Sequence, residues 1–365
     1  MRIVVKVGTS TLAYATGRLN IRHTEQLVKV LSDLKNEGHE VILVSSGAIG
    51  MGVGKLSLPT RPKDTTTKQA CAAVGQCELM YTYDRLFNAY NHTVAQILLT
   101  GVDVEHTERR VNFQNTLSRL LELGALPIIN ENDTVAVDEL RFGDNDTLSA
   151  SVASIIEADL LIILSDIEGL YTANPQKDPT ATLIDTVEAI TPHIYEISGG
   201  AGSSRGTGGM YTKIEAANIA INSGVDMVIA SGASDDSIRA VANGEIRGTH
   251  FVAKSDKPHM RKRWMAFGSR LKGALTVDDG CAKAILTHGS SLLPVGVTMV
   301  TGDFHEGETV SIYHNNEEIA RGIVNYSAED IDRIKGVNSA DIPERLGVAV
   351  AFDEVIHRDN LVVLR

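Results

Sequence analysis

Six short apolar runs alternate with helical patterns over the first two thirds of this 365-residue chain. Several of the runs are nearly unbroken, which is typical of strands covered on both faces of a sheet. We predict strands at residues 3–7, 40–44, 94–99, 126–129, 160–164 and 227–230. We predict helices at residues 24–37, 67–90, 110–123, 146–157 and 209–223. The alternation predicts one α/β domain with a mostly parallel central sheet, and its ligand site should lie beyond the carboxyl ends of the strands.

The pattern changes after about residue 248. Short β-like segments at residues 309–313, 318–320 and 361–364 are separated by glycine turns, which is typical of a small β-rich domain. A basic stretch precedes these segments. We therefore expect a first domain at residues 1–253, a linker at residues 254–272 and a second domain at residues 273–365.

Composition and charge narrow the possible partners. The chain opens on a strand-like segment and holds no apolar run of about 18 residues, so we expect a cytoplasmic protein that does not enter a membrane. A net charge of −12 argues against broad binding to nucleic acids, which depends on neutralising phosphates with Lys and Arg. Cys71, Cys77 and Cys281 match neither a zinc site nor a redox pair, so we expect reduced thiols that act as small apolar residues.

Two lysines lie beside glycine-rich segments. Lys6 lies in the opening strand before Gly8, and Lys213 ends the run from Gly206 at the start of a predicted helix. Glycines before a helix leave backbone N–H groups open to a phosphate, and the helix start adds positive potential. Two ammonium groups near one phosphate would stabilise the charge that builds up in phosphoryl transfer, so the pair suggests a kinase. A flexible glycine loop is the alternative, whereas P-loop and NAD-binding motifs are absent from the sequence.

Two polar clusters lie at a strand end and at a helix start. Asn130-Glu131-Asn132-Asp133 follows the fourth predicted strand, and Gly143-Asp144-Asn145-Asp146 precedes the fourth predicted helix. Such acceptors and amide donors can bind the α-amino and α-carboxyl groups of an amino acid, and a carboxylate can orient a lysine or hold Mg²⁺. Helix capping by Asp144 or Asn145 is the alternative, although it explains one residue rather than both clusters.

Two further strand ends carry weaker signals. Ser46 and Gly47 belong to a glycine-rich turn after the second strand, where small residues and free amides could admit a carboxylate or a phosphate. Ser165 and Asp166 follow the fifth strand, where a carboxylate could bond the hydroxyls or the base of a nucleotide. Ordinary turns explain either segment about equally well.

In combination, several motifs carry a resemblance that spans nearly the whole chain. They lie at residues 4–10 (VVKVGTS), 44–49 (VSSGAI), 69–76 (QACAAVGQ), 127–133 (PIINEND), 142–146 (FGDND), 206–213 (GTGGMYTK) and 354–360 (EVIHRDN). Together these motifs resemble the glutamate 5-kinase family of the amino acid kinase superfamily. The resemblance implies an αβα sandwich followed by a PUA domain.

The same resemblance implies a reaction and its partners. The reaction would be ATP-dependent phosphorylation of the side-chain carboxylate of L-glutamate, with Mg²⁺, as the first step of proline biosynthesis. Proline often inhibits members of this family. We also expect a homo-oligomer, either a dimer or a tetramer.

The resemblance also implies roles for individual residues. Lys6 and Lys213 would stabilise the transferring phosphoryl group, and Asp146 would hold both lysines in place. Glutamate would be bound by Ser46, Gly47, Asn130, Asp133, Asp144 and Asn145. ATP would be bound by Lys6, Ser165, Asp166, Thr207, Gly208, Gly209, Met210 and Lys213. No side-chain ligand is assigned to the metal ion.

Two alternatives stand beside this interpretation. Another kinase of the superfamily, acting on aspartate, acetylglutamate, carbamate or a nucleoside monophosphate, would share the glycine motifs, although the β-rich tail and residues 130–133 weigh against it. PUA domains elsewhere bind RNA, but residues 273–365 hold 7 Lys or Arg against 15 Asp or Glu. This balance has the wrong sign for a phosphate-binding surface, so we expect a regulatory or assembly role instead.

Overall fold

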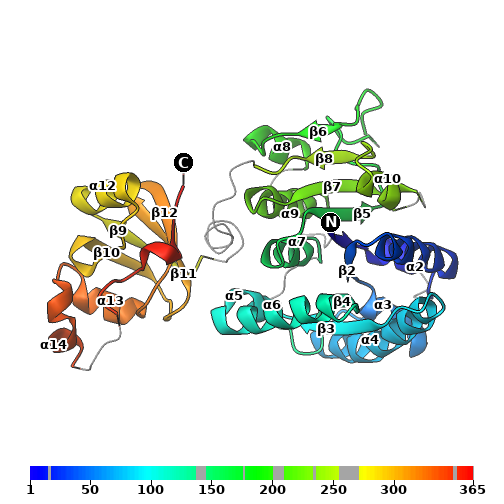
Figure 1. Ribbon diagram of the computed structural model, residues 1–365, viewed down its shortest axis with the longest axis horizontal. Helices are drawn as coiled ribbons and strands as arrows, with labels where there is room; N and C mark the ends of the chain where they lie inside the picture. The colour runs from blue at the N-terminus through cyan, green and yellow to red at the C-terminus, as the bar shows by residue number, and fades with distance from the viewer. Residues whose placement is uncertain are drawn as a thin grey trace. The chain divides into compact units, whose positions relative to one another are not determined.

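The chain forms two compact units in the computed structural model (Figure 1). The larger unit comprises Met1–Val104 and Arg110–Asp256, and the smaller comprises Glu105–Arg109 and Lys257–Arg365. The structure describes residues 1–14, 18–136, 145–175, 177–199, 209–232, 236–254, 271–347 and 352–364.

The larger unit is built on a sheet whose described strands run in the order β3-β4-β2-β1-β5-β7-β8-β6. The strands are β1 (Arg2–Lys6), β2 (Glu40–Val44), β3 (Val94–Leu99), β4 (Leu126–Glu131), β5 (Leu160–Ser165), β6 (Thr186–Val187), β7 (Asp226–Ser231) and β8 (Thr249–Phe251). Neighbours from β3 to β7 pair in parallel, whereas β8 pairs antiparallel to β7. The predicted mostly parallel sheet is confirmed.

Helices lie on both faces of this sheet (Figure 1). They are α1 (Thr9–Leu12), α2 (Ile21–Asn36), α3 (Ala48–Lys55), α4 (Thr65–Asn88), α5 (Gly101–Glu105), α6 (Thr107–Glu122), α7 (Asn145–Ile155), α8 (Pro192–Ile197), α9 (Met210–Asn222) and α10 (Ser237–Ala242). Side chains of α2, α4 and α10 share one apolar cluster with the sheet, while α7 and α9 pack together on the other face. The predicted αβα sandwich is therefore confirmed.

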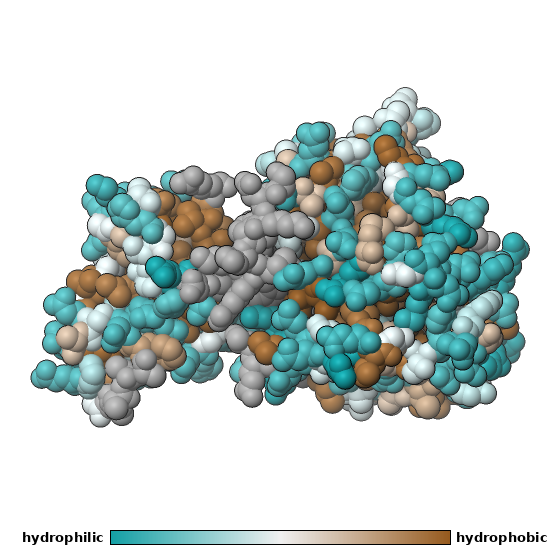
Figure 2. Space-filling model, in the orientation of Figure 1, coloured by the Kyte–Doolittle hydropathy of each residue, from teal (hydrophilic) through white to brown (hydrophobic). Residues whose placement is uncertain are grey.

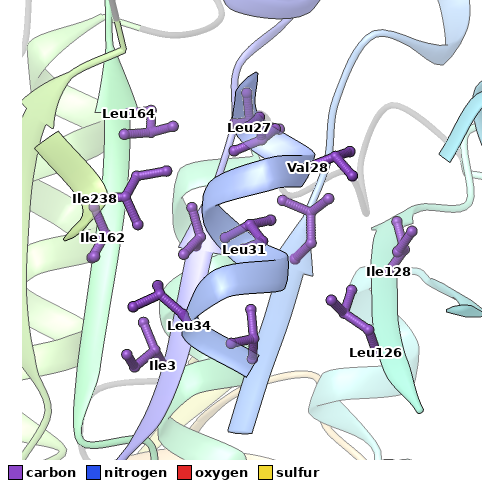
Figure 3. Packing of buried hydrophobic residues seen from close by; sticks show 14 of the residues in the cluster. Ile3, Leu27, Val28, Leu31, Leu34, Leu126, Ile128, Ile162, Leu164 and Ile238 are labelled. Atoms are coloured by element: carbon purple, nitrogen blue, oxygen red, sulfur yellow. The ribbon is translucent and has the colours of Figure 1, made fainter. Parts of the chain in front are cut away.

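Helix α2 covers the middle of one face of the sheet. Leu27, Val28, Leu31 and Leu34 recur every three or four residues and are at most 4% exposed, so they form one apolar stripe. The stripe packs between the side chains of β5 and α10 on one side and those of β4 on the other (Figure 3). The outward residues of α2 are mostly hydrophilic (Figure 2), and the Asn20 side chain caps its first turn by accepting the backbone N–H of His23.

Strand β1 lies in the centre of the sheet and directs alternate side chains to opposite faces. Ile3 and Val5 belong to the cluster under α2. Val4 and Lys6 therefore face the other layer, where α7 contacts β1. The alternation aims the Lys6 ammonium at the start of α7.

The glycine-rich segment after β2 was predicted as a turn, which holds for residues 45–47 but is wrong for residues 48–55, because these form helix α3. Its glycines serve a close crossing of α3 and α4. A Cβ on Gly52 would lie 1.9 Å from the Cys71 carbonyl oxygen, and one on Gly75 would lie 1.7 Å from the Ala48 carbonyl oxygen. Glycine usually weakens a helix, which is why the pattern resembled a turn.

The smaller unit contains a sheet whose described strands run in the order β10-β9-β11-β12-β13. Its elements are β9 (Gly273–Val277), α12 (Asp279–His288), η2 (Pro294–Gly296), β10 (Val297–Gly302), β11 (Thr309–His314), β12 (Glu317–Ile323), α13 (Ala328–Ile334), η3 (Ser339–Asp341), α14 (Ile342–Leu346), η4 (Arg358–Asn360) and β13 (Leu361–Val363). The unit has its own apolar core, drawn from its strands and helices. The predicted β-rich domain is confirmed, although β9, β10 and the helices were not predicted.

The structure also bears on two expectations drawn from composition, one about membrane-spanning helices and one about the cysteines. None of the described helices is long and apolar enough to cross a membrane. All three cysteines are free thiols. Cys71 is buried, as expected of a small apolar residue, and Cys281 is partly buried, but Cys77 is exposed and does not fit that expectation.

Adding one methyl group at the α3–α4 crossing should destabilise the larger unit. We expect Gly52→Ala to lower the free energy of unfolding by roughly 1–3 kcal/mol, because the new Cβ meets backbone rather than a movable side chain. The control is Gly50→Ala in the same helix, whose Cβ meets only the Thr9 methyl group at 3.7 Å. This control should be neutral or stabilising by up to about 1 kcal/mol. Equal midpoints of the two variants in urea unfolding would contradict the prediction.

Candidate active site

A buried carboxylate joins two lysines at the centre of the larger unit. Asp146 lies in the first turn of α7, Lys6 at the end of β1, and Lys213 in the first turn of α9. The Lys6 Nζ lies 2.5 Å from Asp146 Oδ1, and the Lys213 Nζ lies 3.0 Å from Asp146 Oδ2. The structure thus brings together the three residues for which a catalytic role was predicted.

Burial makes these charges depend on one another. Asp146 is 0% exposed, Lys6 4% and Lys213 5%. Burial alone would raise the pKa of Asp146, but the adjacent Lys6 and Lys213 charges outweigh it and hold the pKa below its ordinary value. The carboxylate is therefore ionised at neutral pH, and each ammonium beside it carries three N–H donors.

The start of α9 adds donors beside this ion triad. The Thr212 hydroxyl donates to Asp146 Oδ2 at 2.9 Å, which ties the first turn of α9 to α7. Gly209 precedes α9, and no side chain among the described residues caps the helix start. Open N–H groups, the helix dipole and Lys213 together suit a phosphate. Gly209 and Met210, for which ATP binding was predicted, lie at this helix start.

A network of amides and hydroxyls lies next to the triad, on the side of β2 and β4. Asn145 Nδ2 lies 2.7 Å from the Ser45 carbonyl oxygen, 2.9 Å from Ser46 Oγ and 2.9 Å from Asn130 Oδ1. Asn130 and Asn145 are 2% and 8% exposed, so these bonds are nearly sealed from solvent. The structure brings Ser46, Asn130 and Asn145 together, as predicted.

Two other predicted residues lie on loops of this region. Gly47 has a φ of +98°, a left-handed conformation that favours glycine, and it turns the chain from Ser46 into α3. Asp133 is partly exposed in the turn after β4. Gly47 is thus explained by backbone geometry even without a ligand, whereas Asp133 has a side chain that a ligand can reach.

Ser165 and Asp166 lie at the end of β5, across the sheet from the amide network. Ser165 is buried, and its hydroxyl lies 3.3 Å from the exposed Asp166 carboxylate. The backbone N–H of Gly232, after β7, donates to the Ser165 carbonyl oxygen at 2.7 Å. The two adjacent strand ends are thereby held together, and Asp166 is left accessible.

Some predicted residues lie outside the described part of the chain, and some contacts were missed. Asp144, Thr207 and Gly208 are outside the described residues, so their roles stay predictions. The contact of Thr212 with Asp146 was not predicted. Gln76 and Tyr83, which contact the amide network from α4, were not predicted either. Gln76 does lie in the motif at residues 69–76, but only the fold shows its contact.

The described residues offer no group of three or more His, Cys, Asp or Glu side chains that could hold a metal ion. Asp146, the most buried carboxylate near the lysines, already has both oxygens next to ammonium groups. The chemistry of these side chains therefore suits a phosphate-bearing nucleotide, and it offers Mg²⁺ little beyond the nucleotide's own oxygens and water.

Comparison with known proteins gives the family. The amino acid kinase family profile matches residues 1–231, and the PUA domain profile matches residues 273–346. A protein of Caldanaerobacter subterraneus named glutamate 5-kinase is 52% identical over 365 residues, covering 100% of this chain and 98% of its own. The chain belongs to the glutamate 5-kinase family. We call its two units the kinase unit and the PUA unit.

Relatives of the same name occur in other bacteria. The glutamate 5-kinase of Moorella thermoacetica is 50% identical, covering 100% of this chain and 96% of its own. That of Deinococcus radiodurans is 46% identical and covers all of both chains. A solved isopentenyl phosphate kinase aligns at 16% identity and a TM-score of 0.49, covering 69% of this chain and 100% of its own. That likeness is too low to bear on function.

Removing the buried negative charge should destabilise the kinase unit. We expect Asp146→Asn to lower the free energy of unfolding by roughly 3–5 kcal/mol, because two buried ammonium groups lose this carboxylate. Asp33→Asn is the control, since Asp33 is 47% exposed and faces Arg239 at 3.8 Å. Its effect should stay below about 1 kcal/mol.

The pH dependence has a definite sign. Since the pKa of Asp146 is lower in the folded protein, its contribution is fully present above the unfolded pKa and is lost as pH falls through the folded pKa. The stability difference between wild type and Asp146→Asn should therefore shrink below about pH 4. Urea unfolding from pH 7 to pH 3 measures it, and a difference that grows toward low pH would contradict the assignment.

Proposed function

We propose that this kinase transfers the terminal phosphoryl group of ATP to the side-chain carboxylate of L-glutamate, giving L-glutamyl 5-phosphate for proline biosynthesis. The observation that carries the proposal is the buried Lys6–Asp146–Lys213 triad directly beside the amide network of Asn130 and Asn145. One part suits a phosphate and the other suits the polar end of an amino acid. Full-length relatives named glutamate 5-kinase support the same reaction.

ATP supplies the phosphoryl group, and the roles of the protein are positioning and charge. Asp146 holds the Lys6 and Lys213 ammonium groups in a buried place, where their charges are weakly screened. Negative charge that moves onto the phosphoryl oxygens is stabilised most when such cations are already fixed. Gly209, Met210, Thr207 and Gly208 would bind the nucleotide phosphates at the start of α9, while Ser165 and Asp166 would bind the nucleoside.

Glutamate would lie over the amide network. Asn145 Oδ1 is buried and has no hydrogen-bond partner among the residues that the structure describes, as expected of an acceptor kept for a ligand's ammonium group. Ser46 Oγ accepts from Asn145, which leaves its own hydrogen to donate to a carboxylate. Asp133, Asp144 and Gly47 complete the proposed glutamate site, and Asn130 orients Asn145.

Mg²⁺ would accompany the nucleotide. It would be held mainly by phosphate oxygens and water, since the Asp146 oxygens face the lysines. Its contribution would be additional positive charge at the phosphates.

One assay tests the proposed reaction. ATP consumption is followed with glutamate, aspartate and acetylglutamate in parallel, and hydroxylamine traps any acyl phosphate as a hydroxamate. We expect glutamate alone to support rapid turnover and hydroxamate formation. Turnover with aspartate or acetylglutamate but not with glutamate would replace this proposal by the alternative of another kinase of the superfamily.

The lysines should affect turnover more than substrate binding. We expect Lys213→Met and Lys6→Met each to lower kcat by on the order of 100-fold with little change in the KM for glutamate, since their charges matter most in the transition state. Lys55→Met is the control, because Lys55 is 58% exposed and pairs with Glu78 at the surface. Steady-state kinetics decide, and a near-normal kcat of Lys213→Met would refute the catalytic role.

We also propose that proline inhibits the enzyme and that the enzyme forms a dimer or a tetramer in the cytoplasm. The PUA unit would act as a regulatory or assembly domain. The separate core of the PUA unit supports the last point, since this unit carries none of the assigned catalytic groups. A chain that ends at residue 269 should keep turnover but change its sensitivity to proline or its oligomer size. Proline titration and light scattering measure both, and a folded truncated protein with no turnover would contradict the proposal.

A further inference from the structure

Helix α4 places two polar side chains on its buried side, two turns apart. Gln76 is 8% exposed and Tyr83 is 0% exposed. Asn130 Nδ2 donates to Gln76 Oε1 at 2.9 Å, and the Tyr83 hydroxyl lies 2.9 Å from Ser45 Oγ. Each side chain thus reaches a different strand end of the proposed glutamate site, although neither has a role in the proposed phosphoryl transfer.

Backbone groups fix the direction of the hydrogen bonds in this network. The N–H of Glu131 can only donate, and it lies 2.9 Å from Asn130 Oδ1. The carbonyl of Ser45 can only accept, and it lies 2.7 Å from Asn145 Nδ2. Asn130 must therefore turn its oxygen toward Glu131 and Asn145. Its amide nitrogen is left to face α4, where Gln76 offers an acceptor.

This arrangement also fixes the role of Ser46. Asn145 shares its two Nδ2 hydrogens among Ser45, Asn130 and Ser46 Oγ. Because Ser46 Oγ accepts there, its hydroxyl hydrogen points elsewhere. The Ser45 carbonyl oxygen and Asn130 Oδ1 together hold the Asn145 carboxamide in this orientation.

We propose that Gln76 is a positioning residue for glutamate: by holding the Asn130 carboxamide, it keeps Asn145 as a donor to Ser46 and leaves the Ser46 hydroxyl free to donate to the substrate. This inference rests on the proposed glutamate site. Helix α4, which carries Gln76 and would not touch the substrate, would thus help to set the affinity for glutamate.

The burial of Asn130 explains why the contact with Gln76 matters. Asn130 is 2% exposed, so water cannot easily replace a lost acceptor. An apolar side chain at position 76 leaves Asn130 Nδ2 buried without that acceptor, which is unfavourable. The Asn130 carboxamide is then held from one side alone, and any shift toward another acceptor weakens its bonds to the Glu131 N–H and to Asn145. Glutamate binding is weakened, whereas the lysine contacts at the phosphoryl end are not part of this chain of bonds.

The test compares Gln76→Met with Thr82→Val. Methionine keeps the length of the side chain and removes the acceptor. Thr82 is a matched control on the same helix, because it is 6% exposed and its hydroxyl donates to the Glu78 carbonyl oxygen one turn earlier, at 2.9 Å. We expect Gln76→Met to raise the KM for glutamate roughly three- to tenfold, the effect of one lost hydrogen bond, with the KM for ATP within about twofold. Thr82→Val should change neither.

Other outcomes separate this inference from the proposed function. Equal changes in both KM values, or no change in either, would overturn the role of Gln76 while glutamate turnover by the wild type stands. If the wild type does not phosphorylate glutamate, the proposed function fails and this inference falls with it. Should Gln76→Met fail to fold, Gln76→Asn keeps an amide but is one methylene too short for the bond, and the same ratio of KM changes decides.

Discussion

The ion triad of Asp146 with Lys6 and Lys213 is the interaction on which the rest of the larger unit depends. A carboxylate that is 0% exposed is tolerable only with cations against it, and the two cations come from β1 and α9. The pairing between β1 and β5 and the packing of α7 on α9 both bring these groups together. The charge that matters for chemistry is thus also a condition for the native packing.

The two sides of the site are built from different chemistry, although the first turn of α7 contributes to both through Asn145 and Asp146. The phosphoryl side uses full charges on the face covered by α7 and α9. The amide side uses neutral groups and is supported by α4, which can come close to α3 because Gly52 and Gly75 have no side chains at the crossing. Neutral hydrogen bonds impose direction, whereas ion pairs mainly impose distance. Neutral hydrogen bonds therefore suit recognition of an amino acid, and ion pairs suit stabilisation of a charge that moves during a reaction.

Local sequence patterns predict much of this fold, and there are physical reasons why they miss the other elements. Residues 40–44 were predicted with the bounds that β2 shows, because a buried strand is a nearly continuous apolar run. Residues 94–99 match the bounds of β3, whose sequence is mostly apolar although this edge strand is largely only partly buried. Helix α3 was missed because its glycines serve a contact with a helix that begins ten residues after α3 ends. Strands β9 and β10 were missed because few of their residues are buried, with partly buried positions in β9 and exposed positions in β10.

The residues of the site also divide into those that the sequence predicts and those whose contacts only the fold shows. Lys6, Asp146 and Lys213 were predicted because their residue types and neighbours are typical of phosphate chemistry and because the family resemblance names them. The contacts of Thr212 and Gln76 could not be predicted, since their partners lie far away in the sequence. The roles of Asp133, Ser165 and Asp166 still depend on the resemblance, although the structure places all three at strand ends.

The central place of β1 in the sheet affects how the protein can fold during its synthesis. Among the described strands of this sheet, β1 leaves the ribosome before the others, yet it pairs with β2 on one side and with β5 on the other. A nascent chain that has reached β5 already holds Lys6 and Asp146 but still lacks Lys213, so its buried carboxylate has only one of its two cations. Contacts between distant segments form slowly and expose unpaired edges in the meantime. The ion triad is therefore completed only late in synthesis, when α9 has been made, and β7, α10 and β8 of the same unit follow it.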